Sequence, residues 1–179
     1  MSHDIIGLGG YAQSGKDAVG DVLESMGWER TFFSKALNQA MMILDPIIGP
    51  DQRYSQLVED VGYVEAKKNL EVRRLLQVFG TEVVRKMFGE DTWVNIVRDE
   101  ILAANGPIFV TGVRYPNEIK MVKELGGKTW WVHRPGYGPV NNHSSDNTLT
   151  YEDFDFVIMN DGTLEDLANV VRKVLSFNE

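Results

Sequence analysis

Apolar runs alternate with amphipathic segments along the whole chain. Runs rich in β-branched and aromatic residues predict strands at 4–10, 30–33, 107–111, 129–133 and 154–159. Segments whose apolar residues recur every three or four positions predict helices at 15–26, 34–44, 68–88, 90–104, 115–125 and 163–177. Proline- and glycine-containing stretches predict loops at 45–56 and 135–149. This alternation indicates an α/β fold in which helices cover both faces of a mostly parallel sheet.

A glycine-rich segment joins the first predicted strand to the first predicted helix. It reads Gly10-Tyr-Ala-Gln-Ser-Gly15-Lys16-Asp17. Glycines let successive N–H groups turn inward around an anion, and the helix start adds its positive dipole end. Lys16 adds a charge that can follow the β- and γ-phosphates of a nucleotide. The alternative is a strand-to-helix turn that is merely rich in glycine. We favour a P-loop for ATP phosphates, formed by Gly10, Gln13, Ser14, Gly15, Lys16, Asp17 and Ala18.

Asp17 departs from the usual P-loop, in which Ser or Thr follows the lysine and holds Mg²⁺. A carboxylate is a hard oxygen ligand that suits Mg²⁺. Its negative charge beside a polyphosphate makes sense if a cation lies between them. The alternative is that Asp17 caps the helix or favours its positive end. We therefore expect Asp17 to be the metal residue of the site.

The composition is that of an ordinary globular chain. Its 179 residues, 43% of them hydrophobic, suffice for a single domain, 1–179, with a sizeable core. The absence of cysteine excludes disulfides and thiolate metal sites. A net charge of −8 argues against binding a nucleic-acid polymer, whose backbone requires a basic surface. We see no signal peptide and no run long enough to span a membrane, so we expect a cytoplasmic protein.

The predicted helix at 68–88 has two chemically different faces. Apolar side chains recur on one face, at Leu76, Phe79, Val83 and Met87. Polar side chains lie on the opposite face, at Arg74, Gln77, Thr81 and Arg85, with Arg73 nearby. Guanidinium groups match phosphate oxygens, and amide and hydroxyl groups can hydrogen-bond a base or a sugar. We favour a substrate-binding role for this face over a solvated surface, except at Arg85, which we expect to be solvated.

Polar residues also follow three of the predicted strands, where open α/β sheets bind their ligands. Arg114 follows the strand at 107–111, and Arg134 follows the strand at 129–133. We expect both arginines to contact phosphate, rather than to form surface ion pairs. His143, in the next loop, is more often a structural residue than a base. The segment 160–162 reads as a turn before a helix that Thr163 caps.

Together these segments resemble the deoxynucleoside monophosphate kinases of tailed bacteriophages and related bacterial sequences. The resemblance rests, in family order, on Ser14-Gly15-Lys16-Asp17, Arg73-Arg74-Leu75-Leu76-Gln77, Gly80-Thr81-Glu82, Asp91-Thr92-Trp93, Val113-Arg114-Tyr115-Pro116-Asn117-Glu118, Arg134-Pro135, His143-Ser144-Ser145-Asp146 and Asn160-Asp161-Gly162-Thr163-Leu164. It implies a three-layer P-loop NTPase/kinase fold, ATP and Mg²⁺ as phosphoryl donor, and a deoxynucleoside monophosphate (dNMP) as acceptor. It implies catalytic roles for Lys16, Arg114 and Arg134. The substrate-binding residues it implies are Arg73, Arg74, Gln77, Thr81, Glu82, Trp93, Arg114, Asn117, Glu118, His143 and Asp146, although Trp93 fits a core position equally well.

Two positions depart from the family pattern. The family usually reads Thr-Asp-Val-Arg before its arginine, whereas this chain has Gly112 in place of the acid. An acid that would help to hold Mg²⁺ through water is therefore missing. The His-x-Ser-Glu pattern ends in Asp146, which is shorter by one methylene.

The expected reaction is in-line transfer of the ATP γ-phosphoryl group to the phosphate of a dNMP. The acceptor is already an oxyanion, so positioning and charge neutralisation suffice without a base. We expect a helical substrate-binding part at about 45–104 and a lid-like loop at about 134–149 that excludes water. The location would be the host cytoplasm if the chain is phage-encoded.

Two other functions share the glycine-rich loop. One is a kinase for another small phosphorylated acceptor, of the phosphomevalonate type, which also has Asp after the lysine; the Arg-Arg-Leu-Leu-Gln and Gly-Thr-Glu segments favour a nucleotide acceptor instead. The other is a nucleotide-binding switch, against which the arginines at several strand ends argue. The sequence does not decide which bases are accepted, or whether the protein is a homodimer.

Overall fold

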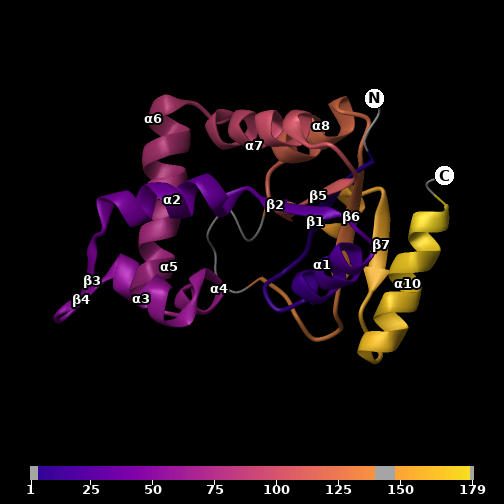
Figure 1. Cartoon of the computed structure of the whole chain (residues 1–179), viewed down its shortest axis with the longest axis horizontal. Coiled ribbons are helices and arrows are strands. Elements are labelled where there is room, and N and C mark those ends of the chain that lie inside the picture. Colours follow the sequence, from indigo (N-terminus) through magenta and orange to yellow (C-terminus); the bar gives the residue numbers. More distant parts are fainter. Residues whose placement is uncertain (1–3, 140–147, 178–179) are drawn as a thin grey trace. The chain divides into compact units, whose positions relative to one another are not determined.

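The computed structural model describes residues 4–139 and 148–177. The chain divides into two compact units, one formed by Met1–Phe32 with Val97–Glu179 and the other by Phe33–Ile96 (Figure 1). The second unit overlaps the segment 45–104 that the sequence assigns to substrate binding. No helix in the described part of the chain is both long and apolar enough to cross a membrane.

The first unit contains a five-stranded sheet. Its strands are β1 (Ile5–Gly9), β2 (Glu29–Phe32), β5 (Ile108–Val113), β6 (Lys128–His133) and β7 (Phe156–Met159). The strand order is β2-β5-β1-β6-β7, and every neighbouring pair is parallel. The predicted parallel sheet is therefore confirmed, with β1 at its centre.

Helices cover both faces of this sheet. Helices α1 (Lys16–Ser25) and α10 (Leu164–Ser176) share a core with Ile6 and Leu8 of β1. Side chains alternate along a strand, so Gly7 faces the other side, where a Cβ would lie 3.1 Å from Val122 of α8 (Pro116–Glu124). Helix α7 (Thr92–Ala103) runs from the second unit into the first, and its Arg98 bonds Glu124 of α8 at 2.8 Å. Sheet and helices thus form the three layers expected of an α/β fold.

The second unit is mainly helical. Its elements are α2 (Ser34–Leu44), β3 (Ile47–Gly49), β4 (Gln52–Arg53), α3 (Tyr54–Val61), α4 (Tyr63–Ala66), α5 (Leu70–Gln77), the π-helix η1 (Val78–Arg85) and α6 (Lys86–Phe88). A separate core surrounds Tyr54, whose hydroxyl donates to Asn38 at 2.7 Å. Burial raises the pKa of this phenol.

Besides its sheet and the helices that cover it, the first unit contains the short 3₁₀ helix η2 (Tyr151–Asp153).

The segment 45–56 was expected to be a loop and is instead an antiparallel hairpin, β3–β4, that leads into α3. Pro50 and Asp51 lie between the strands, and Asp51 has a positive φ of 55°. Breaker residues mark the hairpin turn, whereas Ile48 of β3 is buried in the core of the unit. The strands exist because of that tertiary contact, which local composition does not report.

The segment 68–88 is helical from residue 70, but residues 78–85 form a π-helix between the α-helices α5 and α6. A π-helix has i→i+5 bonds and more residues per turn, so it rotates the side chains that follow away from the α-helical register. Arg85, expected to be solvated, is only 8% exposed, and Met87, expected on the apolar face, is 72% exposed. The face assignment from 3.6-residue periodicity is therefore wrong beyond residue 80.

Candidate phosphate-binding site

The glycine-rich loop lies between β1 and α1, as predicted. Three of its residues have positive φ values: 140° at Gly10, 62° at Gln13 and 102° at Gly15. A Cβ on Gly10 would lie 2.6 Å from the carbonyl oxygen of Val132, so glycine is required there for space as well as for conformation. The loop therefore has the tight backbone turns that point N–H groups toward an anion.

Lys16 is the first residue of α1. Its Nζ atom donates to the carbonyl oxygens of Gly10 at 2.9 Å and Tyr11 at 2.6 Å. The ammonium group is therefore held at the loop, next to the helix start whose N–H groups and dipole also favour an anion. Loop, helix dipole and lysine converge on one place, which is the arrangement required for a nucleotide polyphosphate.

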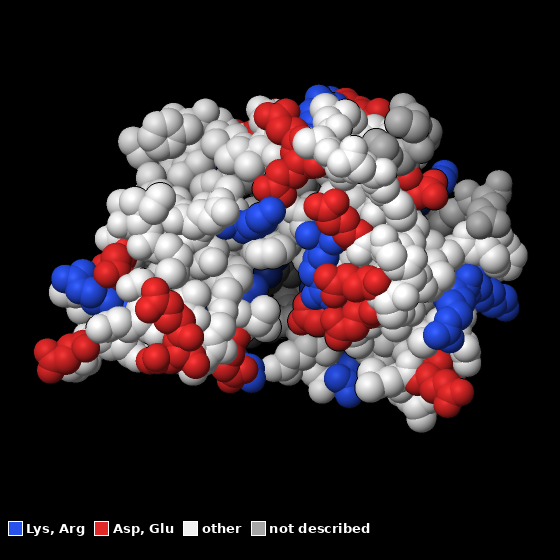
Figure 2. Space-filling view, viewed as in Figure 1, with Lys and Arg blue, Asp and Glu red and all other residues white. Residues whose placement is uncertain are grey.

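Asp17 is the second residue of α1, and its side chain is 73% exposed. Helix α1 has Gly15 as its N-cap and no side-chain capping bond, so Asp17 does not cap the helix. Its carboxylate lies 4.0 Å from Nη1 of Arg30, whose Nη2 bonds Asp21 at 2.7 Å and Glu24 at 2.8 Å. Acidic side chains gather over α1 in Figure 2, with a basic group beside them.

Sequence reasoning missed Arg30, which lies in a run interpreted only as β-prone. The sequence does contain a signal for a basic partner of this helix. The spacing of four and seven residues places Asp17, Asp21 and Glu24 on one face of α1. Like charges at these offsets repel one another, which favours a nearby cation, and the tertiary structure provides Arg30 from β2.

The chemistry of Asp17 suits Mg²⁺. Within residues 4–139 and 148–177, no group of three or more histidine and acidic side chains is placed to hold a metal ion. Mg²⁺ needs few protein ligands, since it keeps several waters and binds substrate phosphates. A single exposed carboxylate beside a phosphate loop therefore fits a Mg²⁺–nucleotide complex.

Arg114 and Arg134 follow β5 and β6, the two strands that flank β1 in the sheet. Both arginines are therefore at the sheet edge where β1 enters the glycine-rich loop, as the sequence predicts. Arg134 Nη1 lies 3.5 Å from the carbonyl oxygen of Gln13, and its guanidinium lies over the ring of Tyr137 at 4.6 Å.

Glu118 has a structural task that the sequence did not reveal. Its buried carboxylate accepts the backbone N–H of Arg114 at 2.6 Å and that of Tyr115 at 3.1 Å, which caps the start of α8. Glu118 thus fixes the backbone that carries Arg114. Its contact with substrate stays a prediction, as does that of the half-buried Asn117.

Gly112 lies in a bulge of β5. Leu8 pairs with Thr111 and Gly9 pairs with Val113, so Gly112 is left between them with a φ of 81°. Left-handed backbone favours glycine over an L-residue. The local backbone therefore explains why glycine suits the place where the family has an acid.

The remaining predicted substrate residues belong to the second unit. Arg74 donates twice to Glu71, at 2.8 and 2.6 Å, and this bond lowers the pKa of the Glu71 carboxyl. Trp93 donates its indole N–H to the carbonyl of Gly80 in the π-helix at 3.0 Å, and Glu82 pairs with Lys86. The half-buried members of the set are Arg73, Gln77, Thr81 and Trp93. His143, Asp146 and half of the expected lid, residues 140–147, lie outside the described residues.

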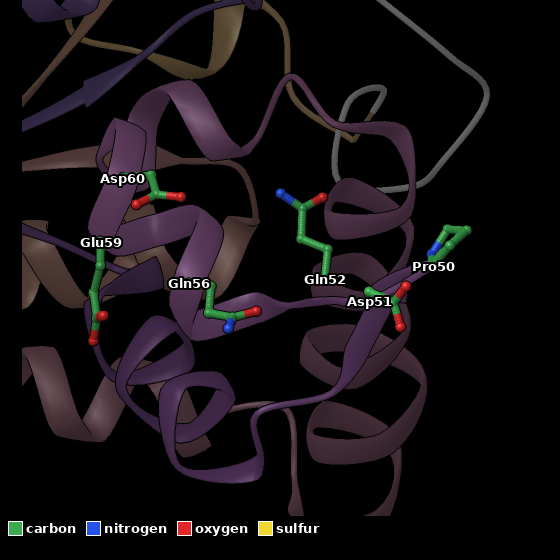
Figure 3. Close-up of a pocket in the computed structure, with 6 residues that line it drawn as sticks. All are labelled: Pro50, Asp51, Gln52, Gln56, Glu59 and Asp60. Atoms are coloured by element: carbon green, nitrogen blue, oxygen red, sulfur yellow. The ribbon is translucent and has the colours of Figure 1, made fainter.

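The second unit also carries an open depression of about 480 Å³ beside the hairpin. Figure 3 shows Asp51 at the hairpin turn, and Glu59 and Asp60 on α3. The glutamines Gln52 and Gln56 complete the polar lining with Pro50. The negative charge of this lining disfavours phosphate, so the depression is not a second phosphate site.

Known structures share this fold. The chain is similar to TT1252 from Thermus thermophilus, with a TM-score of 0.54, 18% identity and coverage of 99% and 98% of the two chains. It is also similar to shikimate kinase from Aquifex aeolicus, with a TM-score of 0.52, 14% identity and coverage of 97% of each chain. At these identities the likeness establishes the P-loop kinase fold alone.

Relatives with closer sequences are viral. The deoxynucleotide monophosphate kinases of Escherichia phage RB69 and Enterobacteria phage T4 are 32% and 30% identical over 108 residues, 58% of this chain. The match covers 44% and 45% of those proteins, so the chain spans about half the length of these relatives. A putative deoxynucleotide monophosphate kinase of Acanthamoeba polyphaga mimivirus is 26% identical over 93% of both chains.

The family model for deoxynucleotide monophosphate kinase matches residues 51–171, more than half of the chain. That span begins after the glycine-rich loop, so the family match and the loop geometry are separate observations. The chain therefore belongs to the deoxynucleotide monophosphate kinase family.

Proposed function

We propose that this chain transfers the γ-phosphoryl group of ATP to a dNMP and releases ADP and the deoxynucleoside diphosphate. One observation carries the proposal: a member of the deoxynucleotide monophosphate kinase family has a glycine-rich loop with Lys16 held at its helix end. The partners would be ATP and a dNMP, in the cytoplasm.

The loop residues act by placing positive charge around the transferring group. Lys16 exchanges its two carbonyl partners for β- and γ-phosphate oxygens, and the N–H groups at the start of α1 bind the same oxygens. Mg²⁺, when bound with the nucleotide, supplies further charge neutralisation, and Asp17 is the residue that we expect to hold it. No base is needed, because the acceptor is already an oxyanion.

Arginines supply the remaining charge in this proposal. Arg134 contacts the carbonyl of Gln13 and reaches the transferring phosphoryl group from there, and Arg114 does so from the end of β5. Arg74 binds the acceptor phosphate, and its present partner Glu71 keeps the guanidinium in place. Trp93 and Gln77 contact the base and sugar.

The test is to incubate the protein with ATP–Mg²⁺ and each deoxynucleoside or ribonucleoside monophosphate in turn, and to detect diphosphate by chromatography. We expect product from at least one dNMP. Lys16→Ala should lower the rate on the order of 10²-fold, about 3 kcal/mol of barrier, while the protein stays folded. Lys173→Ala, a change of an exposed lysine on α10, is the matched control and should leave the rate unchanged.

Consumption of ATP without diphosphate from any dNMP would overturn the proposed function. Product formed only from a different phosphorylated acceptor would replace the dNMP with that acceptor. Near-normal turnover by folded Lys16→Ala would remove the role of the loop.

A further inference from the structure

We propose that Asn160 is a positioning residue of the phosphate site. Its side-chain amide holds the Ser14–Gly15 peptide so that the Gly15 N–H is presented to a bound polyphosphate. The inference deepens the proposed function and rests on the phosphate-binding part of it. The sequence placed Asn160 at a strand end and within a segment that carries the family resemblance, but assigned it no role beyond a turn.

Asn160 is held on one side by the sheet and on the other by the loop. It directly follows β7, and its backbone N–H donates to the carbonyl of His133 at the end of β6 at 2.8 Å. Its Nδ2 donates to the carbonyl oxygen of Ser14 at 2.9 Å. Only a donor can satisfy that carbonyl, so the amide nitrogen, and not the amide oxygen, faces the loop. The half-buried side chain thus connects a strand end to a segment 146 residues away in sequence.

The contact between Asn160 and the loop is close. A Cβ on Gly15 would collide with the Asn160 Nδ2 atom, and Ser14 is only 1% exposed. Glycine is therefore required at position 15 for two reasons: its φ is 102°, and Asn160 occupies the space that a side chain would fill. Packing this tight leaves the peptide between residues 14 and 15 little freedom to rotate.

The orientation of that peptide matters for phosphate binding. In a planar trans peptide, the C=O and the following N–H point in opposite directions. Because the Ser14 carbonyl points at Asn160, the Gly15 N–H points away from it. Gly15 is the N-cap of α1, where backbone N–H groups are available to bind an anion. Loss of the amide donor would let the peptide rotate and would turn this N–H away from the phosphates.

The test compares Asn160→Leu and Asn160→Ala with wild type. Leucine keeps approximately the size of asparagine but has no donor and no charge, so it separates hydrogen bonding from packing. We measure the affinity for inorganic tripolyphosphate by calorimetry and the shift of the Gly15 amide resonance by NMR. Asn169→Ala, a change of an exposed asparagine on α10, is the matched control.

We expect both Asn160 variants to weaken tripolyphosphate binding on the order of tenfold, the equivalent of one hydrogen bond. We expect tripolyphosphate to shift the Gly15 amide strongly in wild type and in Asn169→Ala, and weakly in the Asn160 variants. Wild-type affinity in Asn160→Leu would overturn the proposal, because packing would then suffice. An unshifted Gly15 amide in saturated wild type would also overturn it, and this measurement does not depend on how the variants fold.

Failure of the role proposed for Asn160 can be distinguished from failure of the proposed function. Weakened tripolyphosphate binding in a protein that phosphorylates no dNMP would support the role of Asn160 and reject the acceptor. Wild-type tripolyphosphate binding by the Asn160 variants, in a protein that phosphorylates a dNMP, would reject the role of Asn160 alone.

Discussion

Replacing Gly112 tests whether the bulge of β5 requires glycine at the position where the family pattern has an acid. Gly112 has a φ of 81°, and a Cβ placed on it would meet nothing within 4 Å. Gly112→Ala therefore introduces backbone strain without a steric clash. Gly112→Asp restores the acid that the family has, and Asp tolerates left-handed backbone better than Ala does.

The expected magnitude comes from the backbone alone. A non-glycine residue in left-handed conformation costs about 1–2 kcal/mol. For a chain of this length each kcal/mol shifts Tm by roughly 2–4 °C, so Gly112→Ala should lower Tm by roughly 2–8 °C. Gly112→Asp should be destabilised less than Gly112→Ala. If its carboxylate reaches the metal, it should also need less Mg²⁺ for half-maximal rate than wild type.

The assay is thermal unfolding of each variant, followed by Mg²⁺ titration of the rate. Gly106→Ala is the matched control, because that Cβ would also meet nothing within 4 Å and its φ is not left-handed. The Tm of Gly106→Ala should equal or exceed that of wild type, because alanine lowers the conformational entropy of the unfolded chain. A Gly112→Ala protein as stable as Gly106→Ala would refute the strain argument, and equal Mg²⁺ midpoints for Gly112→Asp and Gly112→Ala would refute a metal role for the restored acid.

Three further outcomes are expected. Asp17→Asn should raise the Mg²⁺ concentration needed for half-maximal rate, since it removes the carboxylate we assign to the metal; an unchanged midpoint would end that assignment. Arg74→Ala should raise KM for the acceptor more than for ATP, whereas Arg134→Ala should lower kcat more than it changes either KM; equal effects on the KM for ATP would contradict both assignments. Partial burial raises the pKa of Asp155, but bonds from the Thr129 N–H at 2.8 Å and hydroxyl at 2.9 Å, with Lys123 nearby, lower it overall. The stability that the carboxylate contributes is therefore complete above its ordinary pKa of about 4 and is lost as the pH falls below it. In urea titrations the gap in unfolding free energy between wild type and Asp155→Asn should narrow from pH 6 to pH 3, and a constant gap would contradict this linkage.

Local patterns determined much of the fold and the core of the site. The parallel sheet follows from apolar runs that alternate with amphipathic helices, and each of its five strands was predicted to within a few residues. The loop from Gly10 to Lys16 was predictable because its conformation depends on glycines and on a neighbouring strand and helix, all adjacent in sequence. Thr163 is the N-cap of α10, as its position before an amphipathic segment indicates.

Only the tertiary structure decided which side chains of different elements meet. Arg30 of β2 bonds the acidic face of α1, and Asn160, which follows β7, bonds the carbonyl of Ser14 146 residues away. Arg85 is buried because a π-helix changes the register of its face, which periodicity counted at 3.6 residues per turn cannot report. Sequence patterns reflect bonds that repeat along the backbone, so they predict elements. The partner of a single side chain depends on which elements the packed core brings together, and that is a property of the whole fold.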